Sequence, residues 1–261
     1  MFRTMHIKIV LLVLLLAFTV NPRVFALAEM SGETAKIVSA MEKAVDPDNK
    51  ASKIRTYTVE SEAEIKQAQI KMFFKTLYKR ENKMLSIVSI PGVMTVKQGF
   101  DGTTAWTSSP ATGVSLGSGD ALLSTQFMTK MSAPDSNLKN IFSKITLAEK
   151  SVNSEGIDCY KLICTIPEKY HMEPTVLYVN KKTLLTLKTE ITVNTSEGKV
   201  PTPLLIKKYK KVHGIMWPEI SELKVMNMMV TQTLKSVKIN SKIPDSAFQP
   251  PKVENTATPQ F

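Results

Sequence analysis

Residues 57–79 read YTVESEAEIKQAQIKMFFKTLYK, and this stretch decides the fold. Up to Ile65, apolar or small side chains alternate with charged or hydroxyl-bearing ones, which is typical of a β-strand with one face in water. From Ile70 the same period of two resumes after a short polar break. The stretch therefore predicts two long strands that form a hairpin.

The second strand of this hairpin carries apolar side chains on both faces, so both faces need a cover. We expect Met72 and Phe74 to point into the interior of the protein. Phe73 and Leu77 lie on the opposite, mostly basic face. We expect the helix that begins the domain to pack against that second face.

This first helix is predicted over residues 31–45. Ser31 can cap it, because its hydroxyl can accept a hydrogen bond from the backbone N–H three residues on. Apolar residues then recur at helical spacing, and Pro47 ends the run. The recurring residues are Ile37, Val38, Met41 and Val45.

Strand-like alternation continues beyond the hairpin, with Pro91-Gly92 and Asp101-Gly102 as turn sequences. It resumes after residue 143 and runs almost to the end of the chain. The further strands are expected at 83–90, 93–100, 103–108, 144–152, 157–166, 175–180, 184–194, 203–212, 217–229 and 230–240. Together they predict an antiparallel sheet of ten or more strands.

The alternation breaks between residues 110 and 143. Pro110 and three nearby glycines predict a loop, and apolar residues then recur at helical spacing from Leu122 to Met131. Pro134 ends that helix, and a short second helix follows it. The sequence therefore predicts two helices inserted between two groups of strands.

A sheet of so many strands must hide its edges, either by closing toward a barrel or by covering its open side. We expect a single domain over residues 29–251, a curved antiparallel sheet forming a half-open barrel with a helical lid. A sandwich of two sheets is the alternative fold. Residues 252–261 are expected to be a flexible tail.

The first 28 residues have the pattern of a secretory signal peptide. Arg3 and Lys8 precede an apolar run at residues 9–20, and small residues suit cleavage near Ala28. That run is about 12 residues long, well below the ~20 needed to cross a bilayer. We expect a periplasmic, monomeric mature protein of 233 residues with a formal charge of +8.

Two cysteines, Cys159 and Cys164, lie in one predicted strand. At ~3.3 Å per residue their Cα atoms are about 16 Å apart, and the odd offset turns the side chains to opposite faces. A disulfide needs Cα atoms within ~7 Å. We expect two buried thiols, with metal binding or redox chemistry as the alternatives.

Signals for catalysis are weak. After the leader, only His171 and His213 remain, on separate predicted loops and without the spacing of a metal site. The sequence has no nucleophile elbow and no phosphate-binding glycine-rich loop. We expect a protein that is not an enzyme and that holds no metal or cofactor.

The basic surplus is densest at residues 207–211, KKYKK. The export signal and the lack of interleaved stacking aromatics argue against a nucleic-acid partner. The cluster could attract an anionic membrane or an acidic partner, since each lysine near such a membrane contributes ~1 kcal/mol. It could equally protect an edge strand against aggregation.

Twelve of the 14 methionines remain after the leader, mostly where helices or inner strand faces are predicted. A flexible, polarisable side chain suits a cavity that accepts ligands of variable shape. It also suits an ordinary core. Composition alone leaves both interpretations open.

Two motifs resemble those of the LolA-like carriers that sort outer-membrane lipoproteins. Residues 99–106, GFDGTTAW, followed by Ser109-Pro110, are similar to that family's Asp-Gly-Lys-Thr-Leu-Trp…Asn-Pro. Residues 243–251, IPDSAFQPP, resemble its C-terminal Ala-x-x-Phe-x-Phe-x-Pro-Pro. The order of the predicted elements also agrees, although the second half of this chain is longer.

The resemblance implies an incomplete barrel of about eleven strands around a hydrophobic cavity that binds acyl chains. In the lipoprotein carrier, an arginine after the second long strand bonds backbone carbonyls of the lid and holds the empty protein shut. Arg80 occupies the corresponding place and is the candidate lid latch. A surface arginine, or one paired locally with Glu81, is the alternative.

On this resemblance we expect a carrier of lipoprotein acyl chains or another lipid, which could exchange cargo with an inner-membrane donor and an outer-membrane acceptor. The alternative is an envelope sensor or scaffold with a packed interior and a protein partner. The lid is expected at about 118–142 together with the first helix. The expected lining or lid residues are Met72, Phe74, Tyr78, Trp106, Leu122, Phe127, Met128 and Met131.

Overall fold

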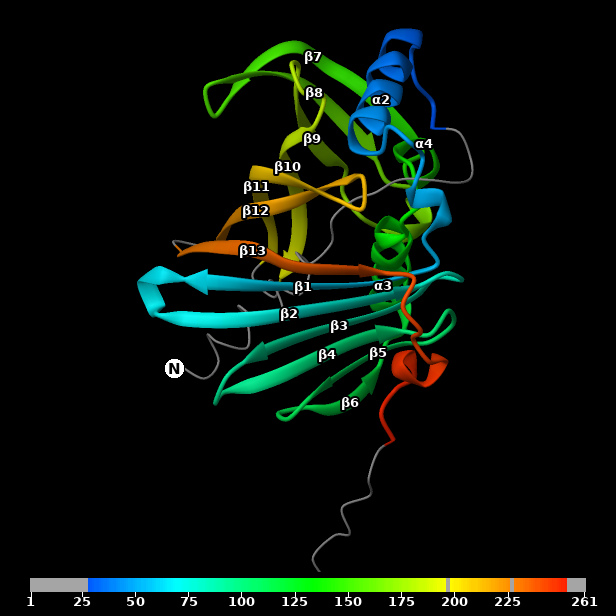
Figure 1. Cartoon of the computed structure of the whole chain (residues 1–261), viewed down its shortest axis with the longest axis vertical. Coiled ribbons are helices and arrows are strands. Elements are labelled where there is room, and N and C mark those ends of the chain that lie inside the picture. Colours follow the sequence, from blue (N-terminus) through cyan, green and yellow to red (C-terminus); the bar gives the residue numbers. More distant parts are fainter. Residues whose placement is uncertain (1–27, 196–197, 226–227, 253–261) are drawn as a thin grey trace, which may run out of the picture.

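The structure is a computed structural model, which describes residues 28–195, 198–225 and 228–252. Nearly all of the predicted signal peptide and tail lies outside these residues. Thirteen strands form one open antiparallel sheet (Figure 1). The expectation of a curved, incompletely closed sheet with a helical cover is confirmed, and the two-sheet sandwich is wrong. The sheet has two strands more than the eleven that the resemblance implied.

The strands divide into two groups along the chain. The first group is β1 (Thr56–Ile65), β2 (Ile70–Lys79), β3 (Lys83–Ile90), β4 (Met94–Phe100), β5 (Ala105–Ser109) and β6 (Gly113–Leu116). The second is β7 (Lys144–Ser154), β8 (Ile157–Thr165), β9 (Thr175–Asn180), β10 (Thr186–Thr195), β11 (Gly198–Val212), β12 (Ile215–Val225) and β13 (Met228–Ile239).

Three α-helices and four short 3-10 turns complete the described elements. The helices are α2 (Gly32–Val45), α3 (Gly119–Ser132) and α4 (Leu138–Ile141). The turns are η1 (Ala51–Lys53), η2 (Lys66–Ala68), η3 (Glu168–Tyr170) and η4 (Asp245–Phe248). Within the described ranges, no helix is long and apolar enough to span a membrane.

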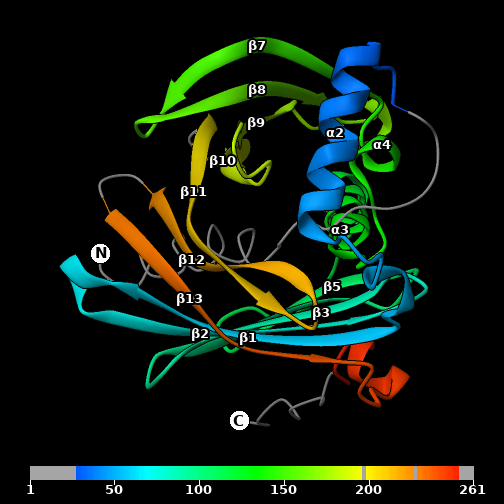
Figure 2. The same cartoon turned by 45° about the horizontal axis from the view of Figure 1, so that its top comes forward.

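The strand order is β6-β5-β4-β3-β2-β1-β13-β12-β11-β10-β9-β8-β7. Each group is a meander, and the pairing of β1 with β13 joins the two, with Tyr57 opposite Ile239 and Ile65 opposite Val230. The free edges β6 and β7 are therefore consecutive strands in the chain, and α3 and α4 connect them. In Figure 2 the helices stand on one side of the curl, between β7–β8 and the strands of the first meander.

The strand β6 was not predicted, because its glycines and the preceding Pro110 indicated a loop. It has only four residues, and Leu116 is 63% exposed, so neither length nor a buried face marks it in the sequence. Its register against β5 pairs Ser109 with Gly113 and Trp106 with Leu116.

The first helix begins as predicted: the Ser31 hydroxyl accepts a hydrogen bond from the Thr34 backbone N–H at 3.2 Å. The prediction of its packing partner is wrong. The helix α2 contacts β7 and β12, whereas Phe73 is 42% exposed. The other predicted contact residue, Leu77, packs in a cluster with the C-terminal segment.

That segment, residues 243–248, is called the C-terminal strap here and lies on the outer face of β2–β5, opposite the face that α3 covers. Ile243 and Phe248 are buried against Leu85 and Trp106. Asp245 bonds both Lys79 and Lys83, at 2.9 and 3.0 Å. These bonds lower the pKa of the Asp245 carboxyl.

Trp106 belongs to this outer face, so its predicted place in the cavity lining is wrong. Its indole Nε1 donates to the Phe248 carbonyl at 2.7 Å, which ties β5 to the strap. Strand register puts Leu77, Leu85, Gly99 and Trp106 side by side on one face. The GFDGTTAW and IPDSAFQPP motifs therefore meet each other.

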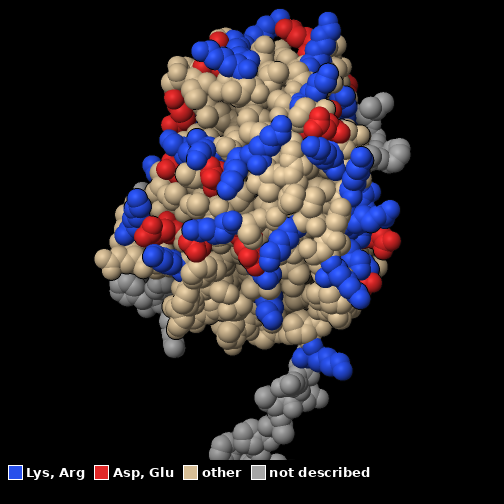
Figure 3. Space-filling model, in the orientation of Figure 1, with Lys and Arg blue, Asp and Glu red and all other residues tan. Residues whose placement is uncertain are grey.

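The lysine cluster at residues 207–211 lies in β11. Pairing of β11 with β10 begins at Leu205, so the lysines occupy the part of β11 that has β12 alone as a neighbour. Lys208 bonds Glu219 at 2.8 Å. This placement favours the protected-edge interpretation, and Figure 3 shows basic and acidic residues interspersed over the visible face.

The two cysteines lie in β8, at opposite ends of it and on opposite faces. Both are buried and free. Burial raises the pKa of each thiol, so both stay protonated at neutral pH.

The contact between Gly99 and Trp106 yields a prediction. A Cβ at Gly99 would lie 2.2 Å from the Trp106 ring, so Gly99→Ala must displace the indole and its bond to the strap. We expect a loss of about 1–3 kcal/mol in the free energy of unfolding, measured by urea denaturation. Gly32→Ala is the matched control, since a Cβ there meets nothing within 4 Å. Equal stability of the two variants would contradict this account of the strap.

Candidate functional site

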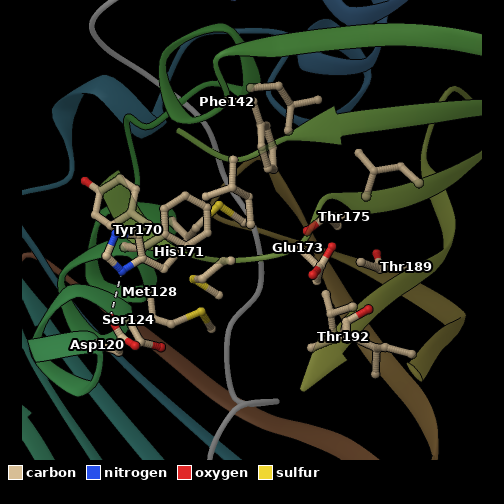
Figure 4. Close-up of a pocket in the computed structure, with 18 of the residues that line it drawn as sticks. Asp120, Ser124, Met128, Phe142, Tyr170, His171, Glu173, Thr175, Thr189 and Thr192 are labelled. Atoms are coloured by element: carbon tan, nitrogen blue, oxygen red, sulfur yellow. Dashed lines mark hydrogen bonds and ion pairs between the residues drawn. The ribbon is translucent and has the colours of Figure 1, made fainter. Parts of the chain in front are cut away.

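A cavity of about 310 Å³ lies between α3 and the strands of the second meander (Figure 4). Its wall is mainly apolar, and its polar residues lie on two sides, with those from α3 and His171 opposite those from the strands and Glu173. The apolar wall comprises Ala121, Phe127, Met128, Met131, Leu138, Phe142, Ile166, Tyr170, Met172, Leu177, Ile191 and Leu204. The polar residues are Asp120, Ser124, His171, Glu173, Thr175, Thr189 and Thr192.

The helical wall comes from one face of α3. Residues 120, 121, 124, 127, 128 and 131 are spaced by three and four, so their side chains project from the same side of the helix. The strand wall follows the period of two, with Thr175 and Leu177 from β9 and Thr189 and Ile191 from β10. The cavity therefore lies between one face of α3 and one face of the strands β9 and β10.

Three aromatic rings of the wall contact one another. Phe127 lies 5.0 Å from Tyr170 and 6.3 Å from Phe142, measured between ring centroids. Neither partner comes from a strand: Phe142 precedes β7, and Tyr170 lies in the connection between β8 and β9. The three rings hold α3 against the segments before β7 and before β9.

Two side-chain pairs lie among the polar residues, and each contains one acid. His171 Nδ1 is 2.8 Å from Asp120 Oδ1, and Glu173 forms an ion pair with Lys199. The His171 and Asp120 side chains are 61% and 80% exposed, so water surrounds their bond. Such an exposed pair lacks the desolvation that a catalytic base usually requires.

Three residues predicted from the sequence line this cavity: Phe127, Met128 and Met131. Leu122 lies on the same helix but is not among the lining residues. Met72 and Phe74 are on the inner face, as expected, yet they pack in a separate apolar cluster with Leu223 and Val230. Tyr78 stacks on the Tyr57 ring at 5.3 Å, in a third cluster that contains Trp217.

Sequence reasoning missed the wall contributed by the end of α4 and by the second meander. The missed residues include Phe142, Tyr170, Met172, Leu177 and Ile191. The alternation in β9 marks Leu177 and Val179 as inward-facing, but it does not show which helix faces them. Tyr170 and Met172 lie in an irregular connection, where no periodicity exists.

Arg80 joins three parts of the chain at the helical end of the sheet. Its Nε donates to the Ile54 carbonyl at 2.8 Å, and its Nη2 donates to the Ser52 carbonyl. Nη2 also lies 2.9 Å from Asp135 Oδ2, in the connection between α3 and α4. Glu81 is 84% exposed and lies 4.0 Å from Lys83, so it is not the partner of Arg80.

Two further polar contacts hold α3 to the first meander. The Tyr57 hydroxyl donates to the Ser132 carbonyl at 2.9 Å, and Gln98 Nε2 donates to Thr125 Oγ1 at 3.3 Å. Burial raises the pKa of Tyr57, which keeps its hydroxyl protonated and able to donate. One side of α3 is therefore hydrogen-bonded to the first meander, and another side faces the cavity.

Comparisons with known proteins define the fold class. Three solved structures match 82% of this chain: a DUF1329 family protein from Desulfovibrio piger, a LolA superfamily protein from Nitrosomonas europaea, and a domain named for outer membrane lipoprotein sorting from Vibrio parahaemolyticus. Their TM-scores are 0.55, 0.55 and 0.52, at 17%, 15% and 14% identity, and 96%, 96% and 94% of their own lengths is covered.

The chain therefore has the LolA-like fold that the two sequence motifs indicated. A scan against family models finds no match, and a search of curated proteins finds none. At these identities the likeness concerns the fold. A shared fold does not define a shared activity, which depends on the residues of the site.

The contacts of Arg80 yield a second prediction. Arg80→Ala removes two hydrogen bonds and an ion pair at a site that is about one-third exposed, so we expect a loss of about 1–2 kcal/mol in unfolding free energy. Amide hydrogen exchange should also accelerate near Ser52 and in the connection that carries Asp135. Arg55→Ala is the control, because Arg55 is exposed and its side chain has no bond within the described residues. Unchanged exchange in both segments would show that Arg80 is a surface residue.

Proposed function

We propose that this protein is a periplasmic, non-catalytic carrier that binds acyl chains of a lipoprotein or another lipid in the cavity beside α3. The observation that carries the proposal is the apolar cavity itself, about 310 Å³ in volume, inside a LolA-like sheet. Pockets of this size and apolar lining are typical of small-molecule sites. The predicted signal peptide supports export.

Energetics support binding without a charged anchor. Burial of about ten methylene groups at ~0.8 kcal/mol each contributes roughly 8 kcal/mol before the costs of ordering. The methionines of the wall, Met128, Met131 and Met172, can adapt to chains of different shape. Binding and release therefore need no covalent chemistry.

In this proposal α3, α4 and their connection act as the lid. Arg80 is the latch, since it ties the lid connection through Asp135 and the first connection through Ser52 and Ile54. A longer chain than the cavity admits would require α3 to move away from β9–β11. Because the latch contacts are polar and partly exposed, they can exchange with water at modest cost.

The alternative function is an envelope sensor or scaffold with a packed interior. The cavity favours the carrier, because a scaffold has no need of an unfilled apolar space. Exchange with an inner-membrane donor and an outer-membrane acceptor is part of the proposal and follows from the resemblance to lipoprotein carriers.

The test is to fill the cavity. Met128→Trp places an indole in the lining, and we expect affinity for the uncharged apolar dye N-phenyl-1-naphthylamine to fall at least tenfold, with loss of co-purifying acyl species in mass spectrometry. Leu122→Trp is the matched control on the same helix and should bind as the unmodified protein does. Circular dichroism checks that both variants are folded. Equal dye binding by Met128→Trp and the unmodified protein would refute the carrier proposal.

A further inference from the structure

Four exposed basic residues gather where β1 begins and β13 ends, and this group is called the basic end here. Its members are Lys53 and Arg55, which precede β1, and Lys238 and Lys242, which lie near and after the end of β13. The pairing of Tyr57 with Ile239 brings the two segments side by side. Figure 1 shows β13 ending on the side of the molecule where α3 lies.

The side chain of Asn240 fastens these two segments to each other. Its Oδ1 accepts a hydrogen bond from the Arg55 backbone N–H at 2.7 Å, and its Nδ2 donates to the Lys53 carbonyl at 3.3 Å. The Asn240 backbone N–H donates to the Thr56 carbonyl at 2.7 Å. None of these bonds uses the charged end of a basic residue, so the backbone forms a fixed support from which the cations project.

Within the described residues, no acid forms an ion pair with a member of the basic end. Glu60, which Lys238 attracts from a distance, bonds Lys75 and Ser236, each at 3.0 Å. Other acids at this end are also paired with other basic residues: Asp48 with Lys50, Glu81 with Lys83, Asp135 with Arg80, and Asp245 with Lys79 and Lys83. The positive charge of the basic end is therefore available to a partner.

The basic run at residues 207–211 differs from the basic end in this respect. Lys207 lies 3.9 Å from Glu222, and Lys208 bonds Glu219 at 2.8 Å. Acids on the neighbouring strand thus offset part of the charge of that run. The place where the chain could attract an anionic surface is set by the tertiary structure rather than by the densest run of lysines.

The composition of the basic end favours a membrane over an acidic protein. Three of its four members are lysines, whose flexible point charges need no fixed geometry, whereas a particular carboxylate is best matched by the planar fork of arginine. Clusters of about four to eight basic residues attract anionic lipids. The large apolar side chains that are exposed in the described ranges, Phe73, Val93, Leu116 and Met229, do not belong to the basic end. Attachment there would be electrostatic and reversible, without an inserted side chain.

We propose that the basic end docks this protein on the surface of membranes that contain anionic lipids. Docking would place the segment at residues 52–55 against the membrane, and the same segment bonds the latch. The Arg80 backbone N–H donates to the Arg55 carbonyl at 2.8 Å, and Arg80 Nε donates to the Ile54 carbonyl at 2.8 Å. The docking surface therefore adjoins the lid connection, and it is independent of what the cavity binds.

The experiment is cosedimentation of the mature chain with vesicles. We expect binding to phosphatidylcholine vesicles that contain about 30% phosphatidylglycerol to be at least tenfold tighter than binding to pure phosphatidylcholine. About 0.3 M sodium chloride should weaken it strongly, because salt screens exposed charges.

A charge-removing variant tests the basic end itself. Lys53→Gln/Arg55→Gln/Lys238→Gln/Lys242→Gln should lower affinity for the anionic vesicles at least tenfold. The matched control is Lys66→Gln/Lys71→Gln/Lys97→Gln/Lys224→Gln, which removes the same charge from exposed lysines outside the basic end and should bind as the unmodified chain does. Circular dichroism and urea denaturation check that both variants are folded.

Three outcomes would overturn the proposal. An equal loss of affinity in both variants would assign vesicle binding to net charge rather than to the basic end. Failure of the unmodified chain to bind anionic vesicles would exclude membrane docking. Tighter, salt-sensitive binding to poly-glutamate than to the vesicles would indicate an acidic protein partner instead. Dye binding by the cavity tests the carrier function separately, so the two proposals can fail independently.

Discussion

The pairing of β1 with β13 is the constraint on which the rest of the structure depends. It joins residues more than 160 positions apart, from Tyr57 opposite Ile239 to Ile65 opposite Val230, and it fuses two meanders into one sheet. The two meanders extend in opposite directions from this pairing, so the edge strands of the sheet are β6 and β7. These two strands follow each other in the chain. The helical connection between them has to cross the open side of the curl, and this places α3 over the inner face.

The helix α3 lies between the two meanders, and its contacts with them differ in character. Toward the first meander it is anchored by polar contacts, Tyr57 to the Ser132 carbonyl and Gln98 to Thr125. Toward the second meander it presents Phe127, Met128 and Met131 to β9–β11, and the space between is not filled. Close packing is the rule in protein interiors, so an apolar space of this size favours occupation by a ligand.

The two sequence motifs, GFDGTTAW and IPDSAFQPP, do not contribute to the cavity. Gly99 lacks a side chain where the Trp106 ring crosses it, and Trp106 bonds the strap at Phe248. These contacts fasten the outer face of the first meander. Conversely, the arginine that follows β2 reaches the helical connections on the other side of the sheet. The motifs thus report how the outer face of the sheet is fastened, and they say little about what the cavity beside α3 could bind.

Local patterns determined much of this protein. Alternation in residues 57–79, the Ser31 cap and the helical spacing of Phe127, Met128 and Met131 follow from side-chain periodicity and backbone hydrogen bonding, which act within a few residues. Only the tertiary structure decided which wall faces α3, why Trp106 lies outside, and that Asp120 meets His171 fifty-one positions away. These features depend on the order of the strands in the sheet. Strand order is set by long-range pairing and by the elements that pack on each face of the sheet. Neither of these produces a periodic pattern in the sequence.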